Sequence, residues 1–291
     1  MTLLAMLWKG APGDEHVYQN YFDGSGWSPQ QQVPEIVTAT HPLWVAYYDQ
    51  ILFAAWKGVS PYQSVFAARY DGPSEWTWLG AVPNAHSSAA PAAAAFDNPA
   101  GKLLLAWKGA GNDVGVYFAT FDSLHWSAVQ AIPSVATSHG PALAPFQNKV
   151  CMAWKGIPGD SGIRYAVHNG AGWSTPALVP NAHTTSQPAL ATYGGQLVLV
   201  WKGGPGDPSL YWSIFEAGHW TPPAQIHAFA AGTGPAAMQF QDRLHLAWKG
   251  VEDDFSIYTA NFDGDFWWGP HQVPAVSTSS SPSLAVFDPA F

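Results

Sequence analysis

The stretch Gln196-Leu197-Val198-Leu199-Val200-Trp201-Lys202-Gly203 contains the signature that decides the fold. Its last three residues, Trp-Lys-Gly, occur six times along the chain at intervals of 47 to 51 residues, beginning at Trp8, Trp56, Trp107, Trp154, Trp201 and Trp248. A second Trp follows each copy after 19 or 20 residues, at Trp27, Trp76, Trp126, Trp173, Trp220 and Trp267. A fixed period of this length indicates one supersecondary unit copied in tandem.

Each unit has the pattern of four short strands. In the fifth unit, apolar runs cover residues 188–193, 196–201 and 210–215, and an outer segment follows at 219–226. Gly-rich and Pro-rich turns separate these runs, which is the pattern of a propeller blade. No window of about twelve residues has sustained helical periodicity, which excludes a helical solenoid.

The second strand of each unit is apolar on both faces. In the third unit Leu103, Leu105 and Trp107 point to one side, and Leu104 and Ala106 point to the other. A strand of this kind is buried between two stacked sheets, as strands are between propeller blades. The first strand is rich in small residues, as at 91–95, which indicates a crowded position near a central axis.

The two ends of the chain complement each other. Residues 1–9 supply a second strand with no first strand before it, and residues 281–287 repeat the first-strand motif. Sharing one blade between the two ends would close the ring and remove an exposed sheet edge. We therefore predict one all-β domain, 1–291: a closed six-bladed β-propeller with four antiparallel strands per blade. The predicted units are 278–291 plus 1–37, 38–86, 87–136, 137–183, 184–230 and 231–277.

Composition limits the partners that the chain can have. Only 11% of its residues are charged, against about 25% in a typical protein, and the net charge of -9 is dispersed. Binding to nucleic acid requires clustered Lys and Arg, so no nucleic-acid partner is expected. No apolar run approaches the roughly 18 residues that span a bilayer, so no membrane insertion is expected.

The cysteine content and the N-terminus bear on the compartment. The single Cys151 lies in an apolar run and is expected to be a small buried hydrophobe, which leaves no internal disulfide. The apolar start of the chain lacks a basic segment and matches the other repeat strands, so it is interpreted as a strand. A cytoplasmic location is expected for want of a signal peptide, with release by a non-classical route left open.

One face of the predicted ring carries recurring polar and aromatic residues. The loop after each second strand and the segment that joins one blade to the next emerge on the same face. Trp offers a flat apolar surface to a sugar ring, and Lys, Asp and His can hydrogen bond to its hydroxyl groups. The candidate ligand-binding residues are Trp8, Lys9, Asp14, Trp56, Lys57, Trp107, Lys108, Asp113, Trp154, Lys155, Asp160, Trp201, Lys202, Asp207, Trp248, Lys249, Asp254, His86 and His183.

Structural roles for the same residues are a direct alternative. The Trp of Trp-Lys-Gly ends a buried strand and could pack between blades, as could the outer Trp. The Lys and the Asp five residues later could bridge their own loop. The second unit has Tyr62 where the others have Asp, so a ligand site that depends on Asp would be altered there.

Three motifs carry a resemblance to known proteins. They are Thr-Thr-Ser-Gln-Pro-Ala-Leu at 184–190, Gly-Asp-Ser-Gly-Ile-Arg-Tyr at 159–165 and Tyr-Phe-Asp-Gly-Ser-Gly-Trp-Ser at 21–28. With their counterparts in all six units, they resemble the bacterial propeller lectins of the PLL type and, more distantly, tectonin and tachylectin propellers. The resemblance implies a lectin with several sugar sites at blade junctions, and fucose-type sugars as the usual ligands. Lectins of the PLL type usually have seven blades, whereas this chain has six units.

Other functions have weaker support. A sialidase-like glycosidase needs several Arg around a carboxylate, and Arg69, Arg164 and Arg243 fall at unrelated positions in three different units. The eleven His residues include matching pairs, such as His86 with His183, but no metal-ligand spacing. We therefore predict no catalysis, no metal and no cofactor.

The predicted function is that of a multivalent carbohydrate-binding protein with shallow sites near the blade junctions. Its partners would be glycans, and its oligomeric state is left open. A protein-interaction scaffold is the alternative, because propellers serve both functions. Repetition favours the lectin, since sugar sites recur from blade to blade whereas a protein-docking face is more often unique.

Overall fold

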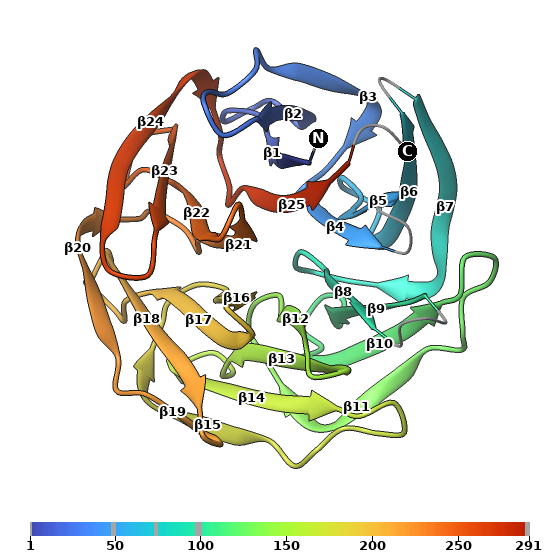
Figure 1. The fold of residues 1–291 in the computed structure, drawn as a ribbon. Helices are drawn as coiled ribbons and strands as arrows, with labels where there is room; N and C mark the ends of the chain where they lie inside the picture. Colours follow the sequence, from blue (N-terminus) through green and yellow to red (C-terminus); the bar gives the residue numbers. More distant parts are fainter. Residues whose placement is uncertain (1, 48–50, 73–74, 97–100, 289–291) are drawn as a thin grey trace.

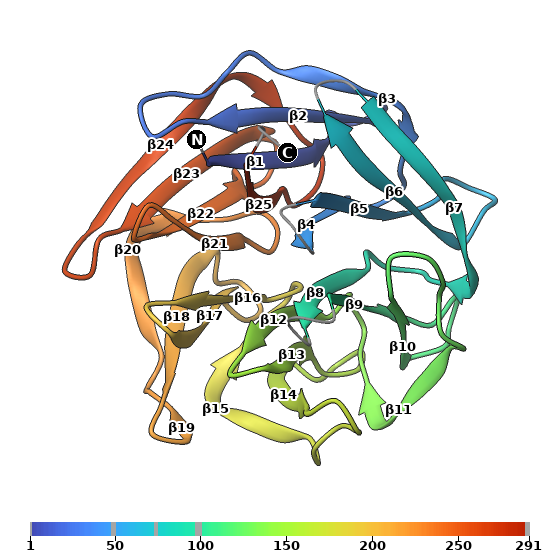
Figure 2. The same ribbon diagram turned by 45° about the vertical axis from the view of Figure 1, so that its right-hand side comes forward.

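The computed structural model describes residues 2–47, 51–72, 75–96 and 101–288, and its strands form six antiparallel sheets around a central axis (Figures 1 and 2). The predicted all-β, six-bladed propeller is thereby confirmed. Within the described ranges, no helix is long and apolar enough to cross a membrane.

The sheets are called blades 1 to 6, and the strands of each blade are named in order from the axis outward. Blade 1 contains β25 (Ser283–Phe287), β1 (Leu3–Lys9), β2 (His16–Phe22) and β3 (Gln31–Val37). Blade 2 contains β4 (Leu43–Tyr47), β5 (Ile51–Lys57), β6 (Ser64–Gly72) and β7 (Glu75–His86). Blade 3 contains β8 (Ala92–Phe96), β9 (Lys102–Lys108), β10 (Gly115–Phe121) and β11 (Gln130–Ala136).

Blades 4 to 6 continue the same order. Blade 4 contains β12 (Ala142–Phe146), β13 (Lys149–Lys155), β14 (Gly162–His168) and β15 (Ala177–His183). Blade 5 contains β16 (Ala189–Tyr193), β17 (Gln196–Lys202) and β18 (Ser209–Glu216), with both β19 (His219–Trp220) and β20 (Ala224–Ala230) paired to β18. Blade 6 contains β21 (Ala236–Phe240), β22 (Arg243–Lys249), β23 (Ser256–Phe262) and β24 (Trp267–Ser277).

The ends of the chain complete blade 1 together, as predicted. Strand β25 pairs antiparallel with β1, with Leu3 opposite Phe287 and Leu7 opposite Ser283. Beyond the strands, the Ser279 N–H donates to the Gly10 carbonyl at 2.9 Å. The inner edge of β1 is therefore fully paired, and the ring has no open seam at this point.

The second strand of each blade lies between two neighbouring sheets. In blade 3, Leu103 and Leu105 pack in one core cluster with residues of blade 2, and Leu104 packs in another with residues of blade 4. All three side chains are fully buried. Burying a leucine completely stabilises a fold by about 1.5–3 kcal/mol, so these alternating clusters hold adjacent blades together.

Small residues line the axis because the blades approach each other closely there. A Cβ added at Gly140 would lie 2.3 Å from the Ala90 carbonyl oxygen, and one added at Gly234 would lie 2.1 Å from that of Gln187. These positions precede the inner strands and leave no room for a side chain. The inner strands enclose an axial cavity of about 300 Å³ lined mainly by Ala, Leu and Pro.

Candidate functional site

The end of each second strand and the end of each fourth strand lie on one side of the ring. In blade 4, Lys155 pairs opposite Ile163, and His183 at the end of β15 pairs opposite Gly162. We call this side the loop face. It consists of the loops 10–15, 58–63, 109–114, 156–161, 203–208 and 250–255 and of the connections between blades. The opposite side, formed by the turns between first and second strands and between third and fourth strands, is the turn face.

The six Trp residues of Trp-Lys-Gly lie in the core between blades and not on the loop face. Their exposed fractions run from 0% to 2% for Trp8, Trp56, Trp107, Trp154, Trp201 and Trp248. Several stack on the aromatic ring of the third strand, as Trp201 does on Tyr211 with ring centroids 6.1 Å apart. A fully buried indole has no face to offer a sugar, which corrects the stacking role predicted for these residues. Inter-blade packing, the alternative drawn from the sequence, describes their position.

The lysine of the same motif joins its own loop to the preceding blade. Lys155 Nζ donates to Ser138 Oγ at 2.9 Å, in the connection from blade 3, and to the Asp160 carbonyl oxygen at 3.0 Å, in its own loop. Burial lowers the pKa of Lys155, and the nearby charge of Asp160 opposes that change. The corresponding pairs on other blades are Lys9 with Ser279, Lys108 with Ser88, and Lys202 with Thr185.

Two lysines lack the bond to the preceding blade. The residues that match Ser138 are Ala39 before blade 2 and Gly232 before blade 6, and neither has a hydroxyl group. Lys57 accordingly donates to the Gly58 carbonyl, and Lys249 donates to three carbonyls of its own loop. Protein acceptors thus engage the ammonium group of every lysine in the motif.

The aspartate five residues after the lysine closes its loop. In blade 3, Asp113 Oδ1 accepts the Gly115 N–H at 2.8 Å, and Asp113 Oδ2 accepts the Tyr117 hydroxyl at 2.9 Å. These two bonds, the backbone bond first, hold the pKa of Asp113 below its usual value. The same Asp–Tyr bond recurs for Asp14 with Tyr18, Asp207 with Tyr211 and Asp254 with Tyr258. In blade 4, Arg164 replaces the tyrosine and lies 2.8 Å from Asp160 Oδ2.

Blade 2 lacks both the aspartate and the tyrosine hydroxyl that donates to it in other blades. Tyr62 stands in place of Asp, and the residue that would donate to it is Phe66, which has no hydroxyl group. The two changes occur together because a buried or half-buried hydroxyl without an acceptor is costly. In blades 3 to 6 the Lys–Asp pairs therefore fit the loop-bridging alternative, with the lysine bonded to the aspartate carbonyl oxygen and not to its carboxylate.

The two predicted histidines are exposed on the loop face. His183 Nδ1 lies 3.1 Å from Ser161 Oγ, and His86 is likewise open to solvent. An open pocket of about 510 Å³ lies beside Lys9, Asp14 and His16. The structure thus brings Lys, Asp and a residue of the connection together most completely in blades 3, 4 and 5. Most of their hydrogen-bonding groups are already engaged within the loop.

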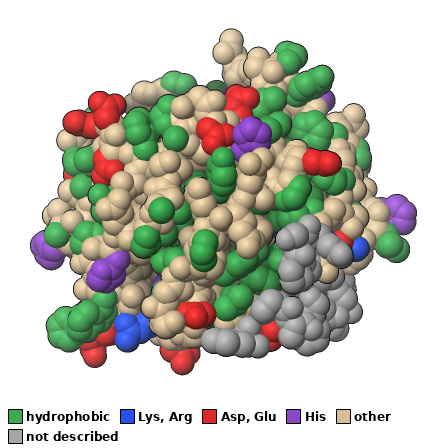
Figure 3. Space-filling model, turned by 90° about the horizontal axis from the view of Figure 1, so that it is seen from above, with side chains coloured by type: hydrophobic (Ala, Val, Ile, Leu, Met, Phe, Trp, Pro, Cys, Tyr) green, Lys and Arg blue, Asp and Glu red, His purple; other side chains and the backbone are tan. Residues whose placement is uncertain are grey.

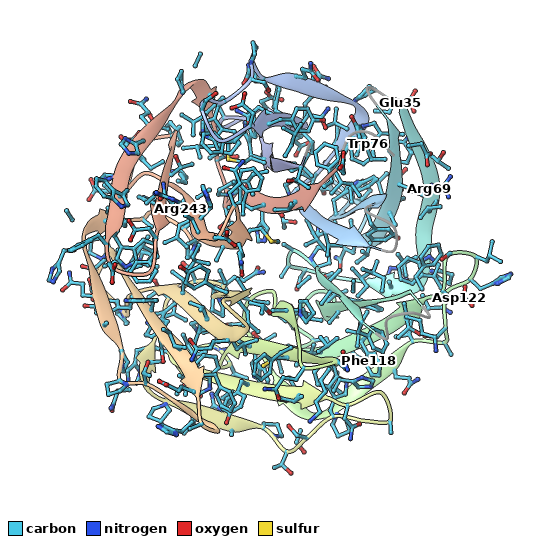
Figure 4. The ribbon with its side chains drawn as sticks, viewed as in Figure 1. Glu35, Arg69, Trp76, Phe118, Asp122 and Arg243 are labelled. Carbon is cyan, nitrogen blue, oxygen red and sulfur yellow. The ribbon has the colours of Figure 1, made fainter. Side chains whose placement is uncertain are left out.

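The turn face carries a cluster of aromatic rings at the junctions between blades. The outer Trp of one blade packs against the third strand of the blade before it, as Trp220 does on Tyr165 and Trp267 does on Trp212. The corresponding pair between blades 3 and 4 is Trp173 and Phe118, with ring centroids 5.8 Å apart. Figure 4 labels Phe118 among the strands where these two blades meet.

A pocket of about 600 Å³ opens at this junction, and we call it the 3/4 pocket. Phe96, Phe118, His168 and Trp173 form its aromatic part, with the His168 ring centroid 5.1 Å from that of Trp173 and 6.0 Å from that of Phe96. Its polar part includes Lys102, Thr120, Gln130, Asn169 and Thr175. Rings beside hydrogen-bonding groups suit a ligand with both an apolar face and hydroxyl groups.

His168 is the buried polar group of the 3/4 pocket. Its side chain is 5% exposed, and its Nδ1 accepts the Gly170 N–H at 3.3 Å. That bond assigns the remaining proton of the neutral imidazole to Nε2. Burial lowers the pKa of His168 below the usual value of histidine, so the neutral form predominates at pH 7.

The recurring motifs do not reveal this pocket, although the sequence contains a signal for it. The last residue of the third strand that pairs with the second strand is Phe22, Tyr70, Phe121, His168, Phe215 or Phe262 in blades 1 to 6. Only blade 4 has a histidine in this aromatic series. The break stands out when the repeats are aligned at Trp-Lys-Gly and compared 14 residues after its Trp.

Charged groups are sparse, and each of the three arginines has a polar partner. Arg69 pairs with Asp71, Arg164 with Asp160, and Arg243 donates to Asn261, each within its own blade. On the side of the ring drawn in Figure 3, acidic and histidine side chains are scattered and basic ones are few. Within the described ranges, no group of three or more His, Cys, Asp or Glu could hold a metal ion.

Comparisons with known proteins agree with this geometry at the level of the fold. No protein-family model matches the chain, and no curated protein matches it in sequence. A fucose-specific lectin from Aleuria aurantia has a similar structure, with a TM-score of 0.70 at 15% identity over 96% of this chain and 97% of that one. AofleA from Arthrobotrys oligospora gives a TM-score of 0.68 at 11% identity, over 94% and 83% of the two chains.

A further match is a protein of unknown function from Dyadobacter fermentans, with a TM-score of 0.60 at 11% identity over 82% and 84% of the two chains. At such identities the likeness shows the fold, which hosts unrelated functions. The chain is thus a six-bladed β-propeller, the architecture also reported for the Aleuria aurantia lectin. The resemblance to the PLL-type and tectonin-like families stays a prediction.

Proposed function

We propose that the protein is a multivalent, non-catalytic carbohydrate-binding protein whose principal site is the 3/4 pocket. The observation that carries the proposal is this pocket of about 600 Å³, in which four rings meet amide and hydroxyl side chains and Lys102. A pyranose has an apolar face suited to the rings and hydroxyl groups suited to the polar side chains. The fucose-specific lectin of the same fold supports this choice of ligand class.

Multivalency follows from the repeat. An outer Trp recurs in all six units, so related clefts between blades are expected to take the same kind of ligand with different affinities. Single sites of this kind are weak, because a shallow pocket buries little of a monosaccharide. Several sites on one rigid ring could raise the avidity for a glycan-bearing surface by about 10²–10⁴.

The non-catalytic part of the proposal rests on the charged groups. The three arginines lie in three different blades, and each contacts a partner in its own blade. They therefore do not form the arginine cluster with which a sialidase-like site holds a carboxylate. Among the described residues that line the 3/4 pocket there is no Asp or Glu, whereas glycosidases commonly use a pair of carboxyl groups.

The test is a glycan-array screen followed by calorimetry on two variants with the best ligand. Phe118→Ala removes one ring of the 3/4 pocket and places there the residue that blade 2 has at the matching position, Ala67. We expect its affinity to fall at least about fivefold, since an aromatic contact contributes roughly 1 kcal/mol. Asp207→Asn on the loop face is the matched control and should leave the affinity unchanged.

The opposite result for the two variants would show that the site lies on the loop face, as the sequence motifs predict. Binding lost in Asp207→Asn but retained in Phe118→Ala would give that result. If the wild-type protein bound no neutral or charged glycan on the array, the protein-interaction scaffold would replace the lectin as the working hypothesis.

A further inference from the structure

Two residues break the repeat on opposite sides of the junction between blades 6 and 1, which we call the 6/1 junction. Three residues before the motif Trp, blade 6 has His245, whereas blades 1 to 5 have Ala5, Phe53, Leu104, Cys151 and Val198. Twelve residues after the motif Trp, blade 1 has Asn20, whereas blades 2 to 6 have Ala68, Ala119, Ala166, Ser213 and Ala260. In each case a polar side chain stands where the other blades have apolar or small ones.

The two breaks meet in one layer of the core. In four other junctions the matching pair belongs to one apolar cluster, as Leu104 and Ala166 do between blades 3 and 4. The other three pairs are Ala5 with Ala68, Phe53 with Ala119, and Val198 with Ala260. At the 6/1 junction, the His245 ring centroid lies 5.8 Å from that of Phe22 in blade 1. Asn20 lies two residues before Phe22 on β2 and therefore on the same face of the sheet.

The amide of Asn20 has no hydrogen-bond partner among the described residues. The residue is 1% exposed, and both Oδ1 and Nδ2 are sealed from solvent. A buried amide without partners costs free energy, and the alanine of four other blades avoids this cost. Parting the two blades would return the amide to water, so Asn20 favours opening at this junction.

His245 adds a cost that depends on pH. The residue is 8% exposed, and its ring lies between those of Phe22 and Phe240, at centroid distances of 5.8 Å and 5.7 Å. Burial, and then the Arg243 guanidinium on the same strand, lower the pKa of His245 to about 4, against an opposing hydrogen bond to the Phe240 carbonyl. The closed junction therefore excludes the protonated imidazole, which must reach water to be stable.

The groups that face His245 do not compensate a positive charge. The uncharged residues around it are Asn20 and Phe22 on β2, Phe240 on β21 and Asn261 on β23. Arg243, at the start of β22 (Figure 4), has the same sign as the protonated imidazole. In the nearby turn of blade 1, the Asp23 carboxylate accepts backbone N–H groups of its own turn.

The two ends of the 6/1 junction are held differently. At the loop face, the Ser279 N–H donates to the Gly10 carbonyl at 2.9 Å, and Lys9 Nζ donates to Ser279 Oγ at 3.2 Å. At the turn face, an exposed bond joins Gln241 Nε2 to the Asp23 carbonyl at 3.3 Å. The loop-face end can thus act as a hinge, and the turn-face end, where His245 lies, is the end that can part.

We propose that the 6/1 junction is an acid-sensitive seam of the ring, where protonation of His245 parts the turn-face ends of blades 6 and 1. Asn20 lowers the cost of opening at every pH, and His245 lowers it further in acid. The seam requires no sugar ligand, so a protein that bound no glycan would still open there.

The sign of the pH dependence follows from proton binding. In the open junction His245 is in water, where the pKa of histidine is about 6.5, and it binds a proton that the closed junction excludes. Opening is therefore favoured progressively as the pH falls below about 6.5, down to the pKa of His245 in the closed junction, about 4. The other five junctions lack a histidine at this position and should stay closed over the same range.

The experiment measures the accessibility of two thiols in one protein. Cys151 is the native thiol in the core cluster between blades 4 and 5, at the position that matches His245. Ala247→Cys places a second thiol in the core of the 6/1 junction, two residues from His245. Both thiols are labelled with dithiodipyridine, which reacts in acid and at neutral pH, and peptide mass spectrometry separates them. Each rate is divided by that of glutathione at the same pH.

Between about pH 7.5 and about pH 4.5, we expect labelling of the introduced thiol to accelerate at least about tenfold, with Cys151 unchanged. His245→Val, which places the residue of blade 5 there, should abolish the acceleration. His245→Gln should abolish it as well, because it keeps a polar side chain that does not titrate. Asn20→Ala should slow the labelling at both pH values and keep the acceleration in acid.

Four outcomes would contradict the seam. Equal acceleration of both thiols would show acid unfolding of the whole ring, and no acceleration of the introduced thiol would show that the junction stays closed. Acceleration that persists in both His245→Val and His245→Gln would overturn the role of His245. An unchanged labelling rate in Asn20→Ala would overturn the role of Asn20.

Discussion

The loop face and the turn face are products of the same six repeats, yet they use their polar groups in opposite ways. On the loop face, Lys155 and Asp160 direct their bonds to backbone and side chains of the protein. On the turn face, His168 keeps one nitrogen without a protein partner beside a pocket, among the residues that the structure describes. The loop face carries the more regular motif, Trp-Lys-Gly, and this motif recurs because it stabilises the fold.

This contrast teaches that repetition in a sequence has two possible causes. A residue recurs either because every blade needs it to pack or because every blade binds the same ligand. Trp-Lys-Gly recurs for the first reason, since its Trp is buried in all six blades and its Lys joins neighbouring blades in blades 1, 3, 4 and 5. His168 breaks the repeat, because the matching residue is Phe or Tyr in the other five blades.

The largest expected effect tests the packing role of the motif Trp. Trp154→Ala should destabilise the fold by about 3–5 kcal/mol, because it removes a fully buried aromatic side chain from between two blades. Chemical denaturation measures the change. A loss below about 1 kcal/mol would contradict the packing role and reopen the motif Trp as a ligand contact.

The next effect concerns the lysine that joins adjacent blades. Lys155→Met should lower the free energy of unfolding by about 1–3 kcal/mol, because the Asp160 carbonyl oxygen and Ser138 Oγ lose their donor. Lys57→Met is the matched control and should cost clearly less, since Lys57 bonds only within its own loop. Equal losses in denaturation curves of the two variants would argue against the bond between blades.

A smaller effect tests the tyrosine that donates to the loop aspartate. Tyr117→Phe should destabilise the fold by about 0.5–1.5 kcal/mol through loss of the bond to Asp113. Tyr18→Phe, Tyr211→Phe and Tyr258→Phe should behave alike in thermal denaturation. Blade 2 already has the phenylalanine at this position, so Phe66→Tyr should give no gain.

The pH dependence of the same contact has a definite sign. The pKa of Asp113 is lowered in the folded protein, so the contribution of this group to stability is complete above the unfolded value of about 4. That contribution is lost as the pH falls below about 4 and through the lower folded value. Asp113→Asn should therefore flatten the stability profile between neutral and strongly acidic pH, and an unchanged slope would contradict the assignment.

The smallest effect tests the exposed histidines of the loop face. His183→Ala should change the free energy of unfolding by no more than about 0.5 kcal/mol, because the side chain is solvent-exposed and makes one peripheral contact. Its glycan affinity should equal that of the wild-type protein. A loss of binding without a loss of stability would show that the loop face contacts the ligand after all.

The fold can be predicted because the sequence features that determine it recur from unit to unit. The two-sided apolar second strand, the small residues of the first strand and the complementary ends each indicate stacked sheets in a closed ring, and the structure has all three. The candidate site was less predictable, because the sequence does not say whether a recurrent Trp faces solvent or a neighbouring blade. Trp201 could have ended its strand at the surface, and only the packing of Tyr211 and the adjacent sheet buries it.

The 3/4 pocket escaped prediction for a different reason. It combines Phe118 of one repeat with His168 and Trp173 of the next, and alignment by a single motif does not bring such residues together. Their proximity depends on the angle between neighbouring blades, which tertiary packing determines.

The pairing of β25 with β1 has a consequence for biosynthesis. Strand β1 is translated long before its partner β25, so its inner edge waits until all the residues between the two strands have been translated. At translation rates of about 5–20 residues per second, that wait is roughly half a minute. A nascent chain would expose an unpaired, hydrophobic edge throughout this time, and slow translation or low chaperone capacity should reduce its yield of folded protein.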